Sequence, residues 1–284
     1  MSFPTEKRAA VIGLGIIGSR ACARLVDAGW QVSCWNRTPK HLAGETDTPE
    51  AAIRGAAVIS IYLKDVPAVR QTIGRIEAFL EPGQIVLNHA TLDLETTHWL
   101  EEICLARGCR FLDTPFTGSK LASANGQLLY YIGGDIGLAK ELEPYLSVTG
   151  RGQLHCGEVG AATVVKLATN LISACTVQAL AESLAIATRH GVSADCLIQA
   201  VSENACTSVL SGMKLPMMAA GNYETHFSLS NMGKDSRYML ALAESVGLET
   251  PAIAAVSKRM TELSEEGLGD LDFSAVAKPY LEKA

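Results

Sequence analysis

A glycine-rich segment near the amino terminus has the spacing of a site for dinucleotide phosphates. The sequence Gly13-Leu-Gly-Ile-Ile-Gly18 ends a short apolar run, residues 9–13, and opens a helix-compatible stretch. In that context the first glycine permits a tight turn, the second lets the backbone approach a pyrophosphate, and the third allows the helix to pack closely on the strand. A glycine turn without a ligand is the alternative. We expect the cofactor to contact Gly13, Leu14, Gly15, Ile16, Ile17 and Gly18.

The end of the second apolar run indicates which dinucleotide binds. A site that prefers NAD carries an Asp or Glu about twenty residues further on, where it holds the ribose hydroxyls. Here the run ends in Trp35-Asn36-Arg37-Thr38, with no acid. Arg37 can pair with a 2′-phosphate through two hydrogen bonds, and Asn36 and Thr38 can add hydrogen bonds of their own. The sequence therefore predicts NADP(H) as the cofactor, against the alternative of a solvated arginine in a loop.

Three further segments have compositions that an ordinary sheet or helix does not explain. They are residues 113–120 with Gly126-Gln-Leu, residues 157–170, and Gly233-Lys-Asp235. With these segments the sequence closely resembles the β-hydroxyacid dehydrogenase family, which includes 3-hydroxyisobutyrate dehydrogenases and the reductases of tartronate semialdehyde, glyoxylate and succinic semialdehyde. The resemblance runs from residue 8 to about residue 280 and includes residues 269–276.

The resemblance marks two residues of the long apolar stretch as catalytic. It places the lysine of the family on Lys166 and its supporting asparagine on Asn170, and a separation of four residues puts both on one face of a helix. A lysine on an apolar helix is costly to bury in its charged form. We therefore expect its pKa to fall toward the working pH, which suits a group that protonates a carbonyl oxygen as hydride arrives. A lysine that extends to solvent or forms an ion pair is the alternative.

The loop at residues 117–119 matches the substrate loop of the family. The resemblance implies that hydroxyl and backbone N–H groups of Thr117, Gly118 and Ser119 hold the substrate carboxylate. Threonine stands at 117 where the usual pattern has serine, which adds a methyl group to the pocket. The variant Gly118-Ser119-Lys120, followed by Gly126-Gln-Leu, is similar to the branch of glyoxylate and succinic semialdehyde reductases. Lys120 either faces solvent or contacts the substrate.

Three more positions correspond to cofactor contacts in the family. Thr91 aligns with the threonine at the nicotinamide end, Leu63 with the contact after the third strand, and Lys234 with a lysine that closes over the cofactor. The residues before Thr91, Asn88-His89-Ala90, depart from the usual Ser-Thr pattern. We interpret His89 as a packing residue rather than an acid or base.

These motifs favour an NADPH-dependent reductase of small carboxylate-bearing aldehydes, of the glyoxylate and succinic semialdehyde type, with a lysine as proton donor. Imine reductases are similar in architecture and share the signature Asn36-Arg37-Thr38, but they characteristically carry another residue where Lys166 stands. A catalytically silent NADP(H)-binding module is a further alternative, which the joint presence of Lys166, Asn170, Thr117 and Lys234 disfavours.

The elements that carry these motifs alternate in the first half of the chain. Apolar runs typical of strands occur at residues 9–13, 32–35, 58–62, 85–87, 111–115 and 128–134, and each of the first four is followed by a helical stretch. Gly29 and Gly108 follow helical patterns, and Thr48-Pro49 is typical of a helix start. The alternation predicts right-handed crossovers. The expected fold is α/β, with an amino-terminal Rossmann-type doubly wound parallel sheet followed by an all-helical domain.

The second half has the pattern of helices alone. Residues 160–190 contain no proline, and they are apolar nearly all round, which favours burial on several sides. Further helical stretches lie at residues 194–201, 209–220, 234–245 and 251–265. We predict an NADP-binding Rossmann domain at residues 1–160 and a helical domain for substrate binding and dimerisation at residues 161–284, in a homodimer or homotetramer. We expect the active site where the long helix meets the carboxyl edge of the sheet.

Composition and charge argue against several other classes of protein. The 284 residues carry a net charge of −6 and no basic run, which disfavours nucleic acid as a partner. No apolar leader precedes the first strand and no uninterrupted apolar run reaches membrane-spanning length, so we expect a cytoplasmic enzyme without membrane contact. The eight cysteines form no CxxC pair and the histidines no HxxxH pair. We expect reduced, buried thiols and no protein-bound metal.

Overall fold

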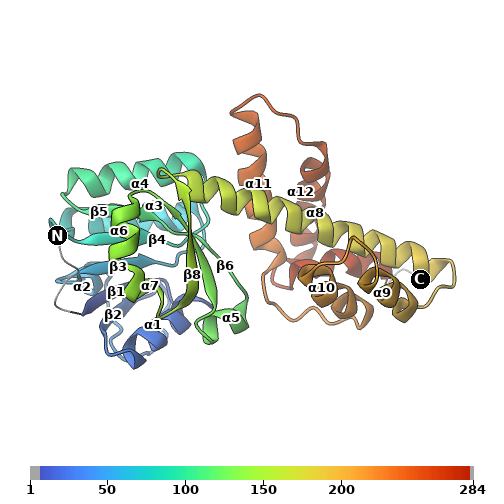
Figure 1. Ribbon diagram of the computed structural model, residues 1–284, viewed down its shortest axis with the longest axis horizontal. Helices are drawn as coiled ribbons and strands as arrows, with labels where there is room; N and C mark the ends of the chain where they lie inside the picture. Colours follow the sequence, from blue (N-terminus) through green and yellow to red (C-terminus); the bar gives the residue numbers. More distant parts are fainter. Residues whose placement is uncertain (1–6, 282–284) are drawn as a thin grey trace. The chain divides into compact units, whose positions relative to one another are not determined.

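The structure is a computed structural model that describes residues 7–281 (Figure 1). It divides into two compact units, residues 1–166 and residues 167–284. Helix α8 (Ala161–Arg189) is continuous through this division. The fold is α/β, because the first unit contains a sheet between helices and the described part of the second is built of helices. The domain boundary that we place after residue 160 stays a proposal.

Eight strands form one sheet in the first unit. Along the sheet they are β2 (Gln31–Trp35), β1 (Arg8–Ile12), β3 (Val58–Ile61), β4 (Ile85–Asn88), β5 (Arg110–Asp113), β7 (Leu128–Gly133) and β6 (Phe116–Thr117), while β8 (Gly150–Gly157) also pairs with β7. The strands from β2 to β5 are parallel. β7 runs antiparallel to β5 and β6, and β8 runs parallel to β7.

The predicted Rossmann-type sheet is confirmed, and the structure adds strands that the sequence pattern did not indicate. β7 coincides with a predicted apolar run, but its antiparallel direction is new because an apolar run carries no information on strand direction. β6 is too short to show a period. β8 was missed because most of its residues are only partly buried, so that it lacks the apolar run of a central strand.

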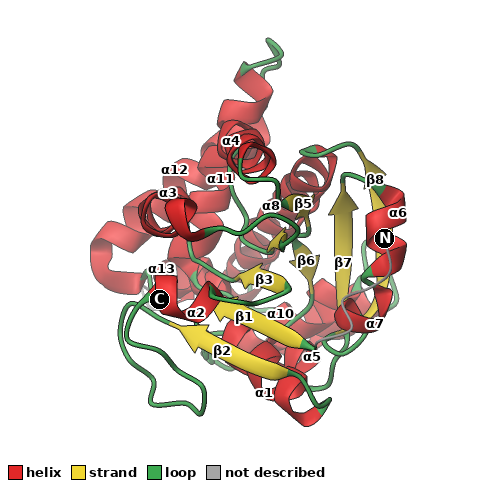
Figure 2. Cartoon of the chain, turned by 90° about the vertical axis from the view of Figure 1, so that its left-hand side faces the viewer, coloured by secondary structure: helices red, strands yellow, loops and turns green. Residues whose placement is uncertain are grey.

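Helices cover both faces of this sheet (Figure 2). Ala9 and Val11 of β1 pack with α1 (Gly18–Asp27), α6 (Ile136–Glu141) and α7 (Glu143–Leu146). The alternate residues of β1, Ala10 and Ile12, pack with α2 (Pro49–Ile53), α3 (Val66–Ile76) and α4 (Leu94–Ala106). Because successive side chains of a strand point to opposite faces, a strand buried on both sides has a continuous apolar sequence. Two short elements complete the unit, η1 (Glu77–Phe79) and α5 (Lys120–Ala124).

The predicted helix ends are confirmed by their local geometry. The Thr48 hydroxyl oxygen accepts a hydrogen bond from the backbone N–H of Ala51 at 3.2 Å, as an N-cap does. Gly29 and Gly108 follow α1 and α4 with φ of 81° and 71°, in the left-handed region that a closing glycine adopts.

The helices of the second unit share one apolar core. After α8 they are α9 (Ala194–Ser202), α10 (Val209–Ala219), α11 (Leu229–Glu244), α12 (Pro251–Leu263), η2 (Ser264–Leu268), η3 (Phe273–Ala277) and α13 (Lys278–Leu281). α11 begins earlier than the predicted start at Lys234, because Ser228 accepts a hydrogen bond from the N–H of Asn231 and caps the helix. Gly233 then lies inside the helix, where a Cβ would come within 3.5 Å of Met260.

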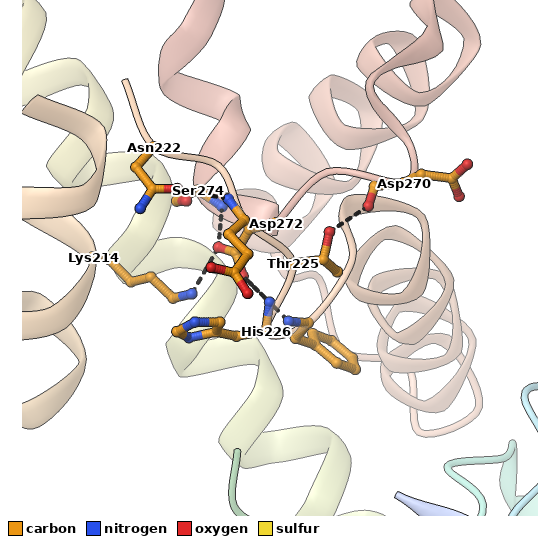
Figure 3. A network of polar contacts seen from close by, with 9 residues as sticks. Lys214, Asn222, Thr225, His226, Asp270, Asp272 and Ser274 are labelled. Atoms are coloured by element: carbon orange, nitrogen blue, oxygen red, sulfur yellow. Dashed lines mark hydrogen bonds and ion pairs between the residues drawn. The ribbon is translucent and has the colours of Figure 1, made fainter. Parts of the chain in front are cut away.

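A buried ion pair fastens the segment that leads into α11 (Figure 3). Lys214 of α10 contacts Asp272 at 2.7 Å, and the exposed fraction of these side chains is 2% and 0%. The other carboxylate oxygen accepts hydrogen bonds from the backbone N–H groups of His226 and Phe227. Burial disfavours the Asp272 carboxylate, but Lys214 and the backbone N–H of Ser274 lower its pKa below the ordinary value.

Helix α8 leaves one apolar face uncovered within a single chain. Val164, Ile172 and Ile186 are 37%, 64% and 63% exposed. Among the helices of the described residues, α8 alone has the length and apolar composition of a membrane span, a test that core helices of soluble proteins also meet.

All eight cysteines are free thiols, and their burial varies. The prediction of buried side chains is correct for Cys22, Cys34, Cys104 and Cys109. It is wrong for Cys196 and Cys206, which are exposed because they lie on and after α9, a helix with no fully buried residue. The described residues contain no group of three His, Cys, Asp or Glu side chains that could hold a metal ion.

Candidate active site

The glycine segment between β1 and α1 is shaped by two close approaches of the backbone. Gly13 has φ of 101°, and a Cβ there would lie 2.5 Å from the carbonyl oxygen of Tyr62. A Cβ on Gly18 would collide with the carbonyl oxygen of Gly13. Gly15 differs, because a Cβ there would meet nothing within 4 Å. The first and third glycines are thus required by the fold, while the second keeps the exposed backbone open toward a ligand.

The start of α1 suits an anion. The helix has no side-chain N-cap and no acidic residue in its first turn, so this turn places no carboxylate at the positive end of the helix. Helix starts of this kind bind phosphate groups through backbone N–H groups. The residues present therefore fit a dinucleotide, which would lie with its pyrophosphate at Gly15, Ile16 and Ile17. Leu63 lies beside this segment, with its Cδ2 atom 3.2 Å from the position of a Cβ on Gly13.

Asn36 connects the glycine segment to the loop after β2. Its side-chain oxygen accepts a hydrogen bond from the N–H of Leu14 at 2.9 Å, and its amide nitrogen donates to the carbonyl oxygen of Thr38 at 2.7 Å. Arg37 and Thr38 are exposed beside it. The side chain of Asn36 thus shapes the loop, and Arg37 beside it presents an exposed positive charge.

A buried polar network lies under the carboxyl ends of β3, β4 and β5. His89 is 3% exposed, and its Nδ1 donates to the carbonyl oxygen of Thr114 at 2.9 Å. Since that carbonyl can only accept, Nε2 is the unprotonated nitrogen and accepts from the Ser60 hydroxyl at 3.2 Å, which in turn accepts from Tyr145 at 2.9 Å. The ring also stacks on Tyr62, with centroids 4.3 Å apart.

Burial lowers the pKa of His89 to about 4, although the Thr114 carbonyl raises it, so the ring is neutral at pH 7. A neutral, fully bonded ring fits the interpretation of His89 as a packing residue. The loop that follows β4 contains Thr91, which is half-buried.

The predicted substrate loop runs from β6 into α5. Thr117 is half-buried. Gly118 has φ of 145°, and a Cβ there would clash with the side chain of Leu128 at 2.8 Å. The Ser119 hydroxyl oxygen caps α5 by accepting from the N–H of Ala122 at 3.2 Å, which leaves the hydroxyl proton as a donor. Lys120, the first residue of α5, is half-buried.

The predicted catalytic pair lies on α8, and the second unit holds the asparagine in place. Lys166 is half-buried and one turn before Asn170. The Asn170 amide donates to a carboxylate oxygen of Asp235 at 2.8 Å, and the other oxygen pairs with Lys234 at 2.8 Å. Lys234 also lies 4.9 Å from the ring centre of Tyr238. Two residues that the sequence analysis assigned separately, Asn170 and Lys234, are thus joined through a third.

Asp235 is the residue that sequence reasoning missed. It is 1% exposed and bonds to a side chain 65 positions away in the chain. The one available signal was its place in the segment Gly233-Lys-Asp235.

Comparisons with known proteins bear on this site. Residues 8–164 match the family described as the NAD-binding domain of 6-phosphogluconate dehydrogenase, and residues 160–280 match the NAD-binding family of NADP-dependent 3-hydroxyisobutyrate dehydrogenase. Glyoxylate/succinic semialdehyde reductase 1 from Arabidopsis thaliana is 32% identical over 276 residues, covering 93% of this chain and 95% of that protein.

Solved structures show the same fold. A 3-hydroxyisobutyrate dehydrogenase from Mycobacterium tuberculosis superposes with a TM-score of 0.89 at 23% identity, over 98% of this chain and 100% of that one. An imine reductase from Pseudomonas sp. gives a TM-score of 0.65 at 18% identity, over 96% of this chain and 99% of that one.

Proposed function

Because the chain belongs to the family of 3-hydroxyisobutyrate dehydrogenase-like proteins and is an NAD(P)-dependent oxidoreductase, we propose that it is an NADPH-dependent reductase of small carboxylate-bearing aldehydes. The substrates we propose are of the glyoxylate and succinic semialdehyde type. The observation that carries the proposal is the fixed pair on α8, where Lys166 precedes by one turn an asparagine held by Asp235. The likeness to a relative named for these two substrates agrees with it.

The roles follow from the donors that the chain presents. When bound, the nicotinamide supplies hydride to the carbonyl carbon. Lys166 donates a proton to the carbonyl oxygen, and the reverse reaction uses the same group as a base. Thr117 and Ser119 donate hydrogen bonds to the substrate carboxylate, with Gly118 leaving its backbone accessible. Asn170, restrained by Asp235, limits the positions that Lys166 can adopt.

We assign NADPH as the preferred cofactor on the charge at the end of β2. Arg37 is exposed there and no Asp or Glu follows Trp35 before residue 45. A carboxylate at this place would repel a 2′-phosphate, whereas a guanidinium pairs with it. The proposed contacts of the cofactor are the glycine segment, Asn36, Arg37, Thr38, Leu63, Thr91 and Lys234. Asn36 also maintains the shape of the glycine segment.

We further propose a homo-oligomer, a dimer or tetramer, in the cytoplasm. The exposed apolar face of α8 supports the oligomer, because large apolar side chains in a row along one helix usually mark a contact surface. Free thiols on all eight cysteines agree with a reducing compartment.

The likeness to imine reductases makes imine reduction the second candidate. NADPH oxidation by the purified protein distinguishes the two when it is measured with glyoxylate, succinic semialdehyde, tartronate semialdehyde and a cyclic imine. We expect turnover of at least one aldehyde acid and none of the imine. Turnover of the imine alone would replace the proposal with the second candidate.

A companion measurement tests the proton donor. Lys166→Ala should bind NADPH with unchanged affinity and lose about 10²–10⁴-fold in kcat, which is the usual contribution of a positioned acid or base. A variant with near wild-type kcat would remove Lys166 from the mechanism.

A further inference from the structure

Helix α8 starts without a capping side chain of its own. Its first turn is preceded by Gly160, with φ of 92°. A side chain cannot stand there, because a Cβ would lie 2.6 Å from Leu94 and 3.1 Å from the ring of His98, both on α4. The N–H groups of a first helical turn have no partner inside the helix. At this helix the N–H of Ala161 donates to the carbonyl oxygen of Glu158 at 3.0 Å, and the N–H of Thr163 bonds to a group from elsewhere.

The sheet supplies that group. Asp113, the last residue of β5, is fully buried, and one of its carboxylate oxygens accepts two hydrogen bonds from Thr163. The backbone N–H and the hydroxyl of Thr163 each donate at 2.8 Å, across fifty positions of sequence. Thr163 is the third residue of α8, the place where an N-cap side chain normally bonds. Asp113, at the end of a strand, therefore does what an N-cap side chain does at other helices.

The surrounding residues bring the helix close enough for this contact. Gly133, which pairs with Asp113 in the sheet, would place a Cβ 2.9 Å from the carbonyl oxygen of Glu158 and 3.2 Å from the N–H nitrogen of Ala162. The Thr163 hydroxyl also lies 3.1 Å from that of Thr97 on α4. The start of α8 is thus held between β5, β7 and α4.

A carboxylate at this position stabilises the start of α8 more than a neutral amide would. Burial raises the pKa of Asp113 to about 6, although the hydrogen bonds from Thr163 act to lower it. The charged carboxylate still predominates at pH 7, and its burial costs free energy. In return one oxygen can accept both Thr163 donors, and the negative charge meets the positive end of a 29-residue helix.

The contact lies one turn before the proposed proton donor. Thr163 and Lys166 are three positions apart, which corresponds to about 4.5 Å along the helix and about 60° around it. Fixing Thr163 on the sheet therefore fixes both the height and the rotation of Lys166 relative to β5. We propose that Asp113 is a positioning residue for catalysis, which sets where the Lys166 side chain starts by anchoring α8 through Thr163. This inference rests on the proposed function, in which Lys166 donates the proton.

A double-mutant cycle between Asp113 and Lys166 tests the inference. In Asp113→Ala we expect kcat to fall by about 10–100-fold, the effect of a misplacement near 1 Å, with the affinity for NADPH unchanged. Asp113→Asn, which can still accept from the Thr163 N–H, should recover part of that loss. In a Lys166→Ala background, Asp113→Ala should cost little more, because residues that act as one unit are not additive.

Thr163→Val and Thr163→Ser provide a milder matched pair, should Asp113→Ala fail to fold. Valine removes only the hydroxyl donor and serine retains it, so kcat should fall for valine and stay near wild type for serine. If the Asp113 or Thr163 substitution lowers kcat by the same factor in the wild-type and the Lys166→Ala backgrounds, the positioning role is overturned. The proposed function is then left intact. Near wild-type kcat in Lys166→Ala would overturn both.

Discussion

Asn36 and Arg37 are adjacent in the chain and have different tasks at the cofactor site. The amide of Asn36 is engaged with the N–H of Leu14 and the carbonyl of Thr38, so it maintains the shape of the glycine segment. Arg37 is exposed beside it and carries the positive charge. The distinction between cofactors with and without a 2′-phosphate should therefore depend on Arg37.

We expect Arg37→Ala to raise the KM for NADPH by roughly 10–100-fold, the equivalent of a lost charge-assisted hydrogen bond. The KM for NADH should change little, because NADH has no 2′-phosphate. Steady-state kinetics with both cofactors measures this, with Arg151→Ala as a control at an exposed arginine of β8. A wild-type enzyme that uses NADH as well as NADPH would contradict the assignment.

At the scale of elements, polar groups fasten strands and helices to one another at buried places. His89 joins the ends of β3, β4 and β5 in the first unit, and Asp272 joins α10, the segment before α11 and η3 in the second. Changing the charge of either group, or removing its partner, should lower the free energy of unfolding.

His89 should make the fold less stable as the pH falls. Its pKa is about 4 in the folded protein, against 6.5 for an ordinary histidine, so between these values the unfolded chain binds more protons. The contribution of His89 to the free energy of unfolding is complete above pH 6.5. It decreases by about 3 kcal/mol in total as the pH falls to 4. Asp113, whose pKa is raised to about 6 by burial, has the opposite slope. Urea unfolding of wild type and His89→Gln at pH 7 and pH 4.5 measures the contribution of the histidine. An equal change in the free energy of unfolding between the two pH values in both proteins would refute the claim.

The buried pair Lys214 and Asp272 should contribute strongly to the stability of the second unit. Lys214→Met leaves a buried carboxylate without its cation and should cost about 3–5 kcal/mol in the free energy of unfolding. The exposed pair Lys258 and Glu262 is a matched control, since Lys258→Met should cost less than about 1 kcal/mol. Amide hydrogen exchange should also accelerate at His226 and Phe227. Equal costs for the two lysine substitutions would show that burial does not decide the contribution.

At the scale of the whole molecule, we propose that the exposed face of α8 packs against a second copy of the chain. Ile172, Ala179 and Ile186 repeat every seven residues, which is the spacing of helix pairs that pack along their length. We expect light scattering to give a multiple of the 30.1 kDa chain mass at micromolar concentration. Ile172→Glu with Ile186→Glu should shift the mass toward a single chain, whereas Val246→Glu, at another exposed apolar position, should not. A wild-type mass of one chain would refute the oligomer.

Local patterns of the sequence predicted most of the elements of this protein. The glycine segment, the strands of the parallel part of the sheet and the caps at Thr48 and Gly29 depend on neighbouring residues, so the period and the turn chemistry are visible in the chain itself. The pair Lys166 and Asn170 is different, because the resemblance to the family implied it, and the sequence itself shows only that a spacing of four residues places both on one helix face.

Tertiary structure alone decided which distant groups hold those residues in place. Asp113 caps a helix that begins 48 positions later, and Asp235 bonds to Asn170 across 65 positions. The edge strand β8 and the antiparallel direction of β7 were likewise not visible in the sequence. The physical reason is the same in each case: a hydrogen bond between residues far apart in the chain leaves no periodic pattern, because the fold, and not the local sequence, brings its donor and acceptor together.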